Sequence, residues 1–260
     1  MLSLVYHRSG RNGELIEAVR RAAEDGITLH EALPAHVDWM LLEQQADAAL
    51  ASPLLYGQRE GDLVLLPGAS LTASGATADV FLHFREGLKT IATLGYYGEA
   101  DINTMLAQVI LKEKYGMAPR LSRLTQPPAE ALTVVDALLL AQKEDAPAAL
   151  PQSAIDLYDE WFDMTQLPFV REVFLAWEAM VTPEFAEAVR TAGEMLDDAA
   201  LRQLEHHMEH ERPEVETSTI PPHYRYRFTD DAGEGLRMFF QLAFFHGLHR
   251  DIPDFRIWEV

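Results

Sequence analysis

The fold is decided by residues 2–57, in which short apolar runs alternate with amphipathic stretches. The apolar runs predict strands and the amphipathic stretches predict helices: LSLVY (2–6), GELIEAVRRAAEDG (13–26), ITLHEALP (27–34), AHVDWMLLEQQ (35–45) and ADAALASPLLYG (46–57). In the first amphipathic stretch, Leu15, Ile16 and Val19 fall on one helical face. Regular alternation of strands and helices is typical of sheets covered by helices, so we expect an α/β fold.

The rest of the chain continues this pattern. We expect strands at 61–71 and 78–84 around the turn TASGAT (72–77), a helix at 101–115, a buried strand at 131–141, a polar amphipathic stretch and an apolar strand within 156–180, helix at 183–210, a loop at 211–224 and a helix at 234–250. The sequence shows no repeat of fixed period and no low-complexity tract.

Composition and charge exclude several classes of function. The 260 residues include 41 acidic and 21 basic side chains, a formal net charge of −20, and this negative field disfavours nucleic acid as a partner. The absence of cysteine excludes disulfides and thiol chemistry. No apolar run approaches the roughly 18 residues that span a bilayer, and the N-terminal stretch lacks a secretory core. We therefore expect a cytoplasmic protein that does not bind membranes.

One motif points to metal chemistry. His206, Glu209 and His210 match the HxxEH pattern of a metalloprotease class, so a zinc hydrolase is one interpretation. The other is a solvated helix face, because further acidic side chains crowd the segment. We favour the second and expect no metal. Phosphate-cradling glycine loops and the GxSxG nucleophile motif do not occur.

Small polar residues recur where the expected strands end and the expected helices begin. They are Ser9, Ser52, Ser70, Ser74, Asn103 and Thr104. Ligands of open α/β sheets bind at the carboxyl ends of strands, so these residues are candidates to line one cleft. Residues of these types also cap helices and form turns, which is the alternative interpretation of each.

Several segments, taken in order, resemble one known family. Tyr6-His7-Arg8-Ser9 is similar to its Tyr-Leu-Asn-Ser signature, and the other matching segments are 33–57, PGASLTASGATADVFLHF (67–84), DALLLAQKEDA (136–146), DLYDEWFDMTQLPFV (156–170) and 224–248. The chain thus resembles the chorismate dehydratases of the futalosine route to menaquinone, over essentially its full length. The segment DLYDEWFDMTQLPFV is the most specific part of the match.

The resemblance implies a type II periplasmic-binding-protein fold, with two lobes and a ligand cleft between them. Lobe one would hold residues 1–85 plus 182–260 and lobe two residues 86–181, with the chain crossing the hinge twice. The implied activity is a lyase reaction in which chorismate, a small anionic dicarboxylate, loses water to give 3-[(1-carboxyvinyl)oxy]benzoate. It needs no metal or organic cofactor.

The resemblance also implies a set of site residues. Arg8 stands where the family has Asn, and Asp79 where it has Ser; both family positions face the substrate. We expect Arg8 and Asp79 to be catalytic. The expected substrate-binding residues are Tyr6, Ser9, Ser52, Ser70, Ser74, Gly75, Asn103, Thr104 and Gln142.

The two altered positions leave two interpretations open. Arg8 could clamp one substrate carboxylate while Asp79 acts as general base. Alternatively, Arg8 and Asp79 pair with each other and leave a pocket for a different ligand. The corresponding alternative to a dehydratase is a non-catalytic or redirected two-lobed protein that binds another small anionic ligand.

Overall fold

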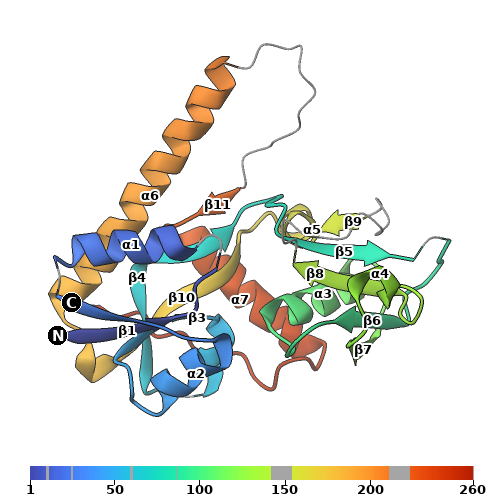
Figure 1. Cartoon of the computed structure of the whole chain (residues 1–260), viewed down its shortest axis with the longest axis horizontal. Helices are drawn as coiled ribbons and strands as arrows, with labels where there is room; N and C mark the ends of the chain where they lie inside the picture. Colours follow the sequence, from blue (N-terminus) through green and yellow to red (C-terminus); the bar gives the residue numbers. More distant parts are fainter. Residues whose placement is uncertain are drawn as a thin grey trace. The chain divides into compact units, whose positions relative to one another are not determined.

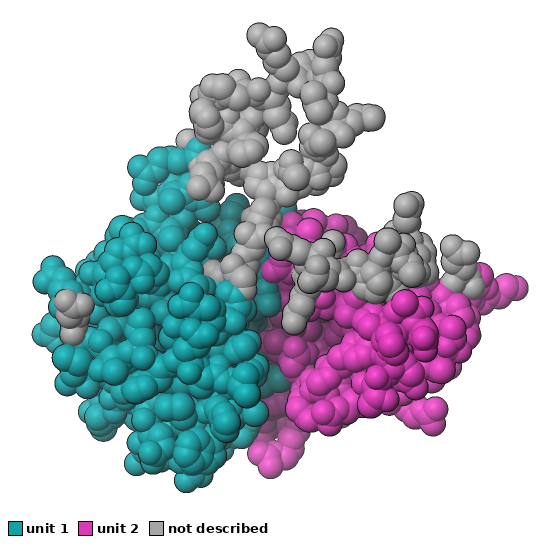
Figure 2. All heavy atoms as spheres, in the orientation of Figure 1, with its two compact units in different colours: residues 1–72, 170–233, 253–260 teal, residues 73–169, 234–252 magenta. Residues whose placement is uncertain are grey.

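The computed structural model describes residues 1–9, 12–24, 26–58, 61–85, 87–141, 154–210 and 223–259; at 201 and 203–210 the backbone alone is described. The chain forms two compact units (Figure 2). Unit 1 comprises residues 1–72, 170–233 and 253–260, and unit 2 comprises residues 73–169 and 234–252. The chain therefore changes unit at 72/73, 169/170, 233/234 and 252/253, whereas the resemblance implied boundaries at 85/86 and 181/182 and two crossings.

Unit 1 is built on a six-stranded sheet of order β11-β4-β10-β3-β1-β2 (Figure 1). Its strands are β1 (Leu2–Tyr6), β2 (Ile27–Glu31), β3 (Ala48–Ala51), β4 (Leu63–Ala73), β10 (Phe169–Trp177) and β11 (Tyr224–Arg225). Strand β1 lies between β2 and β3 and runs parallel to both, and β10 runs antiparallel to β3. The apolar character of β1 and β3 follows from their place inside the sheet, where both faces of a strand are covered.

Helices cover the sheet of unit 1 as the amphipathic stretches predicted. They are α1 (Asn12–Ala22), α2 (Pro34–Leu42) and α6 (Pro183–His210), together with the short 3-10 helices η1 (Pro53–Gln58) and η2 (Glu178–Met180). Helix α1 buries Leu15, Ile16 and Val19 and packs against α6 (Figure 1). Helix α6 lies against β4 at Gly193, where a Cβ atom would be only 2.3 Å from the Gly68 carbonyl oxygen.

Unit 2 is built on a five-stranded sheet of order β7-β6-β8-β5-β9. The strands are β5 (Val80–Phe84), β6 (Thr93–Tyr96), β7 (Arg120–Arg123), β8 (Ala137–Ala141) and β9 (Ala154–Asp156). Strand β6 runs parallel to β7 and β8, and β5 runs antiparallel to β8 and β9. The helices are α3 (Ile102–Glu113), α4 (Pro128–Ala131), α5 (Leu157–Thr165) and α7 (Asp230–Phe245), of which α7 begins in unit 1.

An aromatic cluster joins α5 and α7 in the core of unit 2. Trp161 contacts the rings of Phe169 and Phe239 at centroid distances of 5.7 and 6.2 Å, and Phe239 packs edge-on against Phe240 at 5.3 Å. Such pairs bury a large apolar area and add a favourable ring geometry. The segment DLYDEWFDMTQLPFV therefore contributes the aromatic core against which α7 packs.

The expected elements are confirmed in most places, with several differences. Strands β6, β7, β9 and β11 were not predicted, and Tyr224 of β11 was expected in a loop. Ala131, expected to begin a strand, lies in the short helix α4. Asp197 of α6 is buried, although acidic side chains are mostly exposed in folded proteins, and it accepts a hydrogen bond from the Tyr226 N–H at 2.6 Å. Tyr226 follows β11, so Asp197 fixes the chain there.

Candidate functional site

The carboxyl end of β1 is organised by Asn12, the first residue of α1. Its side-chain amide donates to the His7 carbonyl at 2.6 Å and to Glu172 Oε2 at 2.9 Å. Its side-chain oxygen accepts from the Ser9 N–H at 2.7 Å. Asn12 is 1% exposed, so all of these bonds form away from solvent. Residues 7–9, which follow β1, are thereby held at the position where parallel strands bind ligands.

Glu172, in β10, is the acidic group of this cluster, and the sequence analysis missed it. Burial raises the pKa of its carboxyl, while the charge of Arg171, the hydrogen bond from Asn12 and the nearby His7 oppose that shift. Glu172 lies inside β10, next to Val173, which pairs with Ala51 at the end of β3. A titratable group with a raised pKa at such a place is a candidate for a functional role. One signal was available: Glu172 is the only carboxylate in the apolar run FVREVFLAW.

The Ser9 hydroxyl lies in the same loop and is enclosed by protein. It has no hydrogen-bond partner among the described residues. A buried hydroxyl without a partner costs free energy, so such groups are rare and are often satisfied by a ligand. Ser9 remains a predicted substrate-binding residue.

Arg8 is exposed and forms an ion pair within unit 1. Its Nε donates to Glu31 Oε2 at 3.0 Å and its Nη2 to the Tyr6 hydroxyl at 3.4 Å. These contacts, led by the one with Tyr6, raise the pKa of the guanidinium. Both Arg8 and Glu31 side chains are more than half exposed, so the pair is weak and can exchange. Arg8 therefore has Glu31 as its carboxylate partner in this structure, and Asp79 belongs to unit 2.

The two remaining candidates of unit 1 make structural contacts. The Ser52 hydroxyl accepts from the Leu54 N–H at 3.3 Å and closes the turn after β3. Ser70 lies inside β4 with 0% exposure, and its hydroxyl bonds to the Thr72 hydroxyl at 2.7 Å. The contact of Ser52 fits the turn interpretation, and Ser70 makes its hydrogen bond within its own strand.

Unit 2 contributes the loop between β4 and β5, which contains Ser74, Gly75 and Asp79. Asp156 fixes this loop, because its Oδ2 accepts from the N–H groups of Thr77 at 3.0 Å and Ala78 at 2.7 Å. Gly75 and Ala78 have positive φ angles of 124° and 57°, so the loop turns sharply before Asp79. Asp79 is half-buried and directly precedes β5.

Asp156 also caps α5, since its Oδ1 accepts from the N–H groups of Tyr158 at 2.9 Å and Asp159 at 3.2 Å. Burial raises the pKa of Asp156, against the four backbone hydrogen bonds that favour its charged form. The first residue of DLYDEWFDMTQLPFV thus positions the loop that carries three of the predicted site residues.

Asn103 and Thr104 lie in the first turn of α3. Thr104 is 2% exposed and forms a reciprocal cap with Asp101, to whose Oδ1 its hydroxyl donates at 2.9 Å. The Asn103 side-chain oxygen accepts from the Tyr158 hydroxyl at 2.7 Å. The capping interpretation therefore holds for Thr104, and Asn103 is oriented by α5. Gln142 lies outside the described residues.

The HxxEH motif falls in the last turns of α6, where the side chains of His206, Glu209 and His210 lie outside what is described. Within the described parts of the chain, no group of three or more side chains could hold a metal ion. The helices described there include none long and apolar enough to cross a membrane.

Comparison with solved structures defines the class of fold. The alkanesulfonate-binding protein SsuA from Xanthomonas axonopodis pv. citri matches with a TM-score of 0.63 at 16% identity, covering 100% of this chain and 98% of its own. A protein from Archaeoglobus fulgidus matches with a TM-score of 0.60 at 14% identity, covering 95% and 98%. The chain therefore has the α/β fold of periplasmic binding proteins, in two units that each carry one mixed sheet. Fold alone does not determine activity.

Sequence comparison then gives the family. Residues 14–244 match the menaquinone biosynthesis family, and the chain belongs to it. A chorismate dehydratase from Thermus thermophilus is 29% identical over 171 residues, which are 59% of this chain and 61% of that protein. The match thus spans less than two thirds of that relative's length. The family resemblance inferred from the sequence motifs is confirmed.

Proposed function

We propose that this protein is a chorismate dehydratase that forms 3-[(1-carboxyvinyl)oxy]benzoate in menaquinone biosynthesis. The observation that carries the proposal is the similarity to the Thermus thermophilus chorismate dehydratase within a chain that belongs to the menaquinone biosynthesis family. The polar groups at the end of β1 and in the loop before β5 supply the types of side chain that the reaction needs. A small anionic dicarboxylate is the proposed ligand.

The reaction removes one proton from a ring carbon and the hydroxyl group from the neighbouring carbon, and the two leave as water. The electron pair of the broken C–H bond becomes a ring double bond, which makes the product aromatic. The protein must therefore supply a base for the proton, an acid for the departing hydroxyl, and donors for two carboxylates. Because one group can accept the proton and then return it, a single carboxyl suffices for both roles.

Arg8 and Asp79 have the chemistry for these tasks. We assign Arg8 to a substrate carboxylate, which would replace the exposed Glu31 as its partner. Asp79, in the loop fixed by Asp156, is the proposed base. Ser9 and Asn103 are proposed to donate hydrogen bonds to the substrate. Glu172 is a positioning residue, because it holds Asn12 and, through Asn12, the Ser9 backbone.

Incubation with chorismate tests this function, with product followed by chromatography and mass detection. Wild-type protein should form a product lighter than chorismate by one water. Arg8→Ala should lower turnover about a hundredfold, which is about 2.7 kcal/mol in the barrier, without changing the melting temperature. Arg20→Ala is the matched control, because Arg20 forms a similar exposed ion pair, with Glu17 on α1, and has no assigned role.

Two results would overturn the assignment. Equal turnover in wild type and Arg8→Ala would remove Arg8 from the site. A rise in melting temperature with chorismate, without any product, would favour the two-lobed binding protein instead. A cytoplasmic location is part of the proposal, since a biosynthetic enzyme acts where its substrate is made, and cell fractionation tests it.

A further inference from the structure

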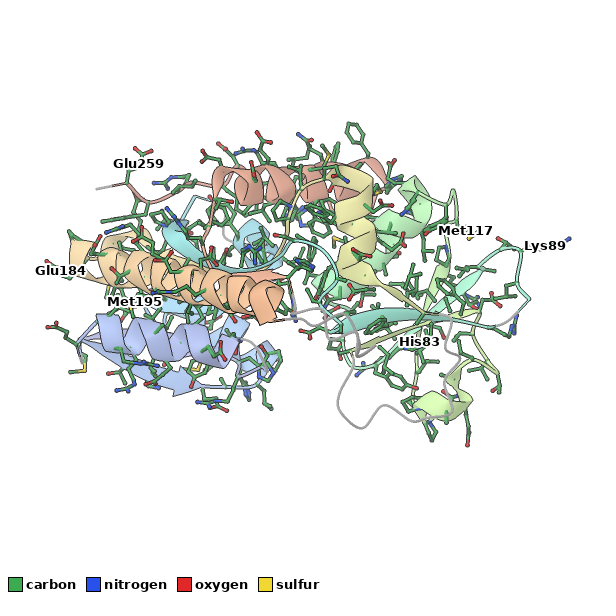
Figure 3. The ribbon with its side chains drawn as sticks, turned by 90° about the horizontal axis from the view of Figure 1, so that it is seen from above. His83, Lys89, Met117, Glu184, Met195 and Glu259 are labelled. Atoms are coloured by element: carbon green, nitrogen blue, oxygen red, sulfur yellow. The ribbon has the colours of Figure 1, made fainter. Side chains whose placement is uncertain are left out.

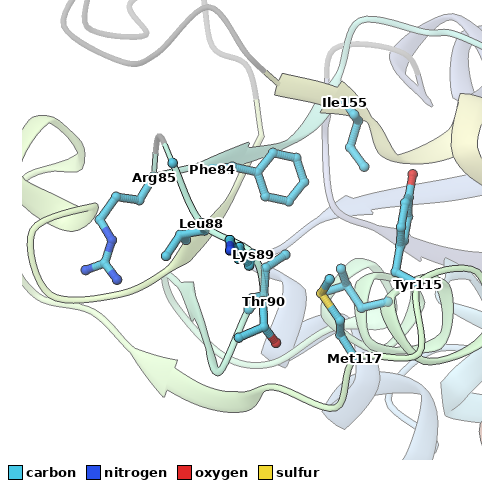
Figure 4. A pocket seen from close by; sticks show the side chains of 11 residues that line it. Phe84, Arg85, Leu88, Lys89, Thr90, Tyr115, Met117 and Ile155 are labelled. Carbon is cyan, nitrogen blue, oxygen red and sulfur yellow. The ribbon is translucent and has the colours of Figure 1, made fainter.

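A cavity of about 420 Å³ lies within unit 2 (Figure 4). It is bounded by the end of β5, the loop that follows β5, the C-terminal end of α3 and strand β9. Its apolar lining comprises Phe84, Leu88, Ile91, Leu111, Met117 and Ile155. A volume of this size and an apolar wall are typical of sites for small molecules.

The cavity is distinct from the candidate functional site. Asn103 lies in the first turn of α3, whereas Tyr115 and Met117 follow the last turn. A helix of 12 residues is about 18 Å long, so the two places are separated by the length of α3. None of the predicted site residues lines the cavity. Figure 3 shows Lys89 and Met117 at the same end of unit 2.

Two residues that line the cavity, Tyr115 and Arg85, are held by hydrogen bonds to side chains that do not line it. The Tyr115 hydroxyl donates to Glu160 Oε2 at 2.7 Å, which fixes the ring at the end of α3. Arg85 donates to Asp136 Oδ1 at 2.5 Å, and Asp136 Oδ2 in turn accepts from the N–H groups of Ala92 and Thr93. Because these partners lie outside the cavity, it is preformed, and a ligand would bind without a large ordering cost.

Among the described lining residues, the two charged ones are cationic. Arg85 is paired with Asp136, whereas Lys89 is exposed and forms no ion pair with any residue that the structure describes. In a chain with 41 acidic and 21 basic residues, an apolar cavity whose described lining carries positive charge disfavours cations. An amphipathic anion fits both the apolar lining and its positive charge. Its apolar part would be removed from water, and its anionic group would lie near the Lys89 ammonium.

We propose that this cavity is a second ligand site, which binds a small aromatic monocarboxylate. The ring lies between Phe84, Met117 and Ile155, and the carboxylate lies at Lys89 beside the loop after β5. The proposal is independent of the dehydratase activity, since it uses none of the residues assigned to that reaction.

Binding of 2-naphthoate, measured by calorimetry, tests the proposal, with uncharged 2-naphthylmethanol as the matched probe. Met117→Trp fills the cavity and should abolish binding of both probes. Lys89→Ala should weaken 2-naphthoate about threefold, the size expected for an exposed ion pair, and leave 2-naphthylmethanol unchanged. Arg250→Ala, which removes an exposed cation of unit 2 outside the cavity, should change neither affinity.

The folded state of each variant is checked by its melting temperature, and Leu88→Trp replaces Met117→Trp if the latter does not fold. Unchanged 2-naphthoate binding in the filled variant would overturn the proposal, as would no binding of 2-naphthoate to the wild type. Complete displacement of 2-naphthoate by chorismate, with binding kept in the filled variant, would place the probe at the dehydratase site instead. Equal weakening of both probes by Lys89→Ala would overturn the assignment of Lys89.

Discussion

Two partly buried carboxylates, Glu172 in unit 1 and Asp156 in unit 2, each position candidate site residues of their own unit, and they do so in opposite ways. Burial raises the pKa of each. Asp156 accepts four backbone hydrogen bonds, which fix a loop and a helix start. The described contacts of Glu172 include one hydrogen bond, from the side chain of Asn12. The difference indicates that Asp156 stabilises the fold, whereas Glu172 positions Asn12 and its burial lowers the stability of the folded state.

Replacement of Asp156 by Ala should have the largest effect on stability. The variant loses the cap of α5 and the acceptor for Thr77 and Ala78, so we expect a loss of about 2–3 kcal/mol in the free energy of unfolding. Urea denaturation measures this loss. Asp156→Asn is the control, because it keeps one of the two oxygens and should lose about half as much. A loss below about 0.5 kcal/mol in Asp156→Ala would contradict the structural role of this carboxylate.

Replacement of Glu172 should instead affect turnover. Glu172→Ala leaves Asn12 without its acceptor, and we expect kcat for chorismate to fall about tenfold, or about 1.4 kcal/mol in the barrier. Glu172→Gln keeps an acceptor oxygen and should stay within about twofold of wild type. If Glu172→Gln lost as much activity as Glu172→Ala, the charge of Glu172 would matter rather than its hydrogen bond, and the positioning role would be wrong.

The pH dependence of stability should distinguish the ionised from the protonated form of the Glu172 carboxyl. Since burial raises the folded-state pKa of Glu172, the folded chain binds this proton more tightly than the unfolded chain, whose Glu pKa is about 4.3. Wild-type stability is therefore lowered as pH rises from about 4.3 through the folded-state pKa. Glu172→Gln lacks this loss. Its melting temperature should equal that of wild type near pH 4 and exceed it by a few degrees at pH 8. A constant difference between pH 4 and pH 8 would contradict the raised pKa.

The smallest effects on stability are expected at two enclosed hydroxyls, one in each unit. Ser9 Oγ and Thr77 Oγ1 have no hydrogen-bond partner among the described residues. Removing an unpaired hydroxyl costs no hydrogen bond and relieves the cost of burying that group, so Ser9→Ala and Thr77→Val should each leave the free energy of unfolding unchanged or raise it by up to about 1 kcal/mol. Thermal unfolding measures both. Ser9→Ala should also raise the KM for chorismate, and an unchanged KM would remove Ser9 from the substrate site.

The fold was predictable where local pattern and burial agree. The runs at 2–6 and 13–26 are confirmed as β1 and α1, because a strand inside a sheet and an amphipathic helix carry strong local hydrophobic patterns. Strands β6 (TLGY) and β7 (RLSR) were missed, since four residues are too few to show an alternating pattern. Strand β7 pairs with β6, and β6 also pairs with β8. Pairing between strands that are distant in sequence cannot be predicted from a local pattern.

The site was less predictable, because its organising contacts are distant in sequence. Asn12 and Glu172 are 160 residues apart, and Asp156 lies 79 residues from Thr77. The residue types drew attention to Ser9 and to the loop before β5, whose site roles stay predictions. They left open whether Thr104 and Ser70 bind a ligand or make internal hydrogen bonds, and they could not indicate that Arg8 pairs with Glu31.

A single-turnover measurement tests the central claim most directly. Equimolar protein and chorismate are mixed, and chorismate, product and protein-bound ligand are quantified over time, with Asp79→Asn in parallel. The dehydratase account predicts that one molecule of the dehydrated aromatic product appears for each chorismate consumed, and that Asp79→Asn slows this step by about 10²- to 10⁴-fold. Chorismate that stays bound and intact, or product formed equally fast by Asp79→Asn and wild type, would contradict it.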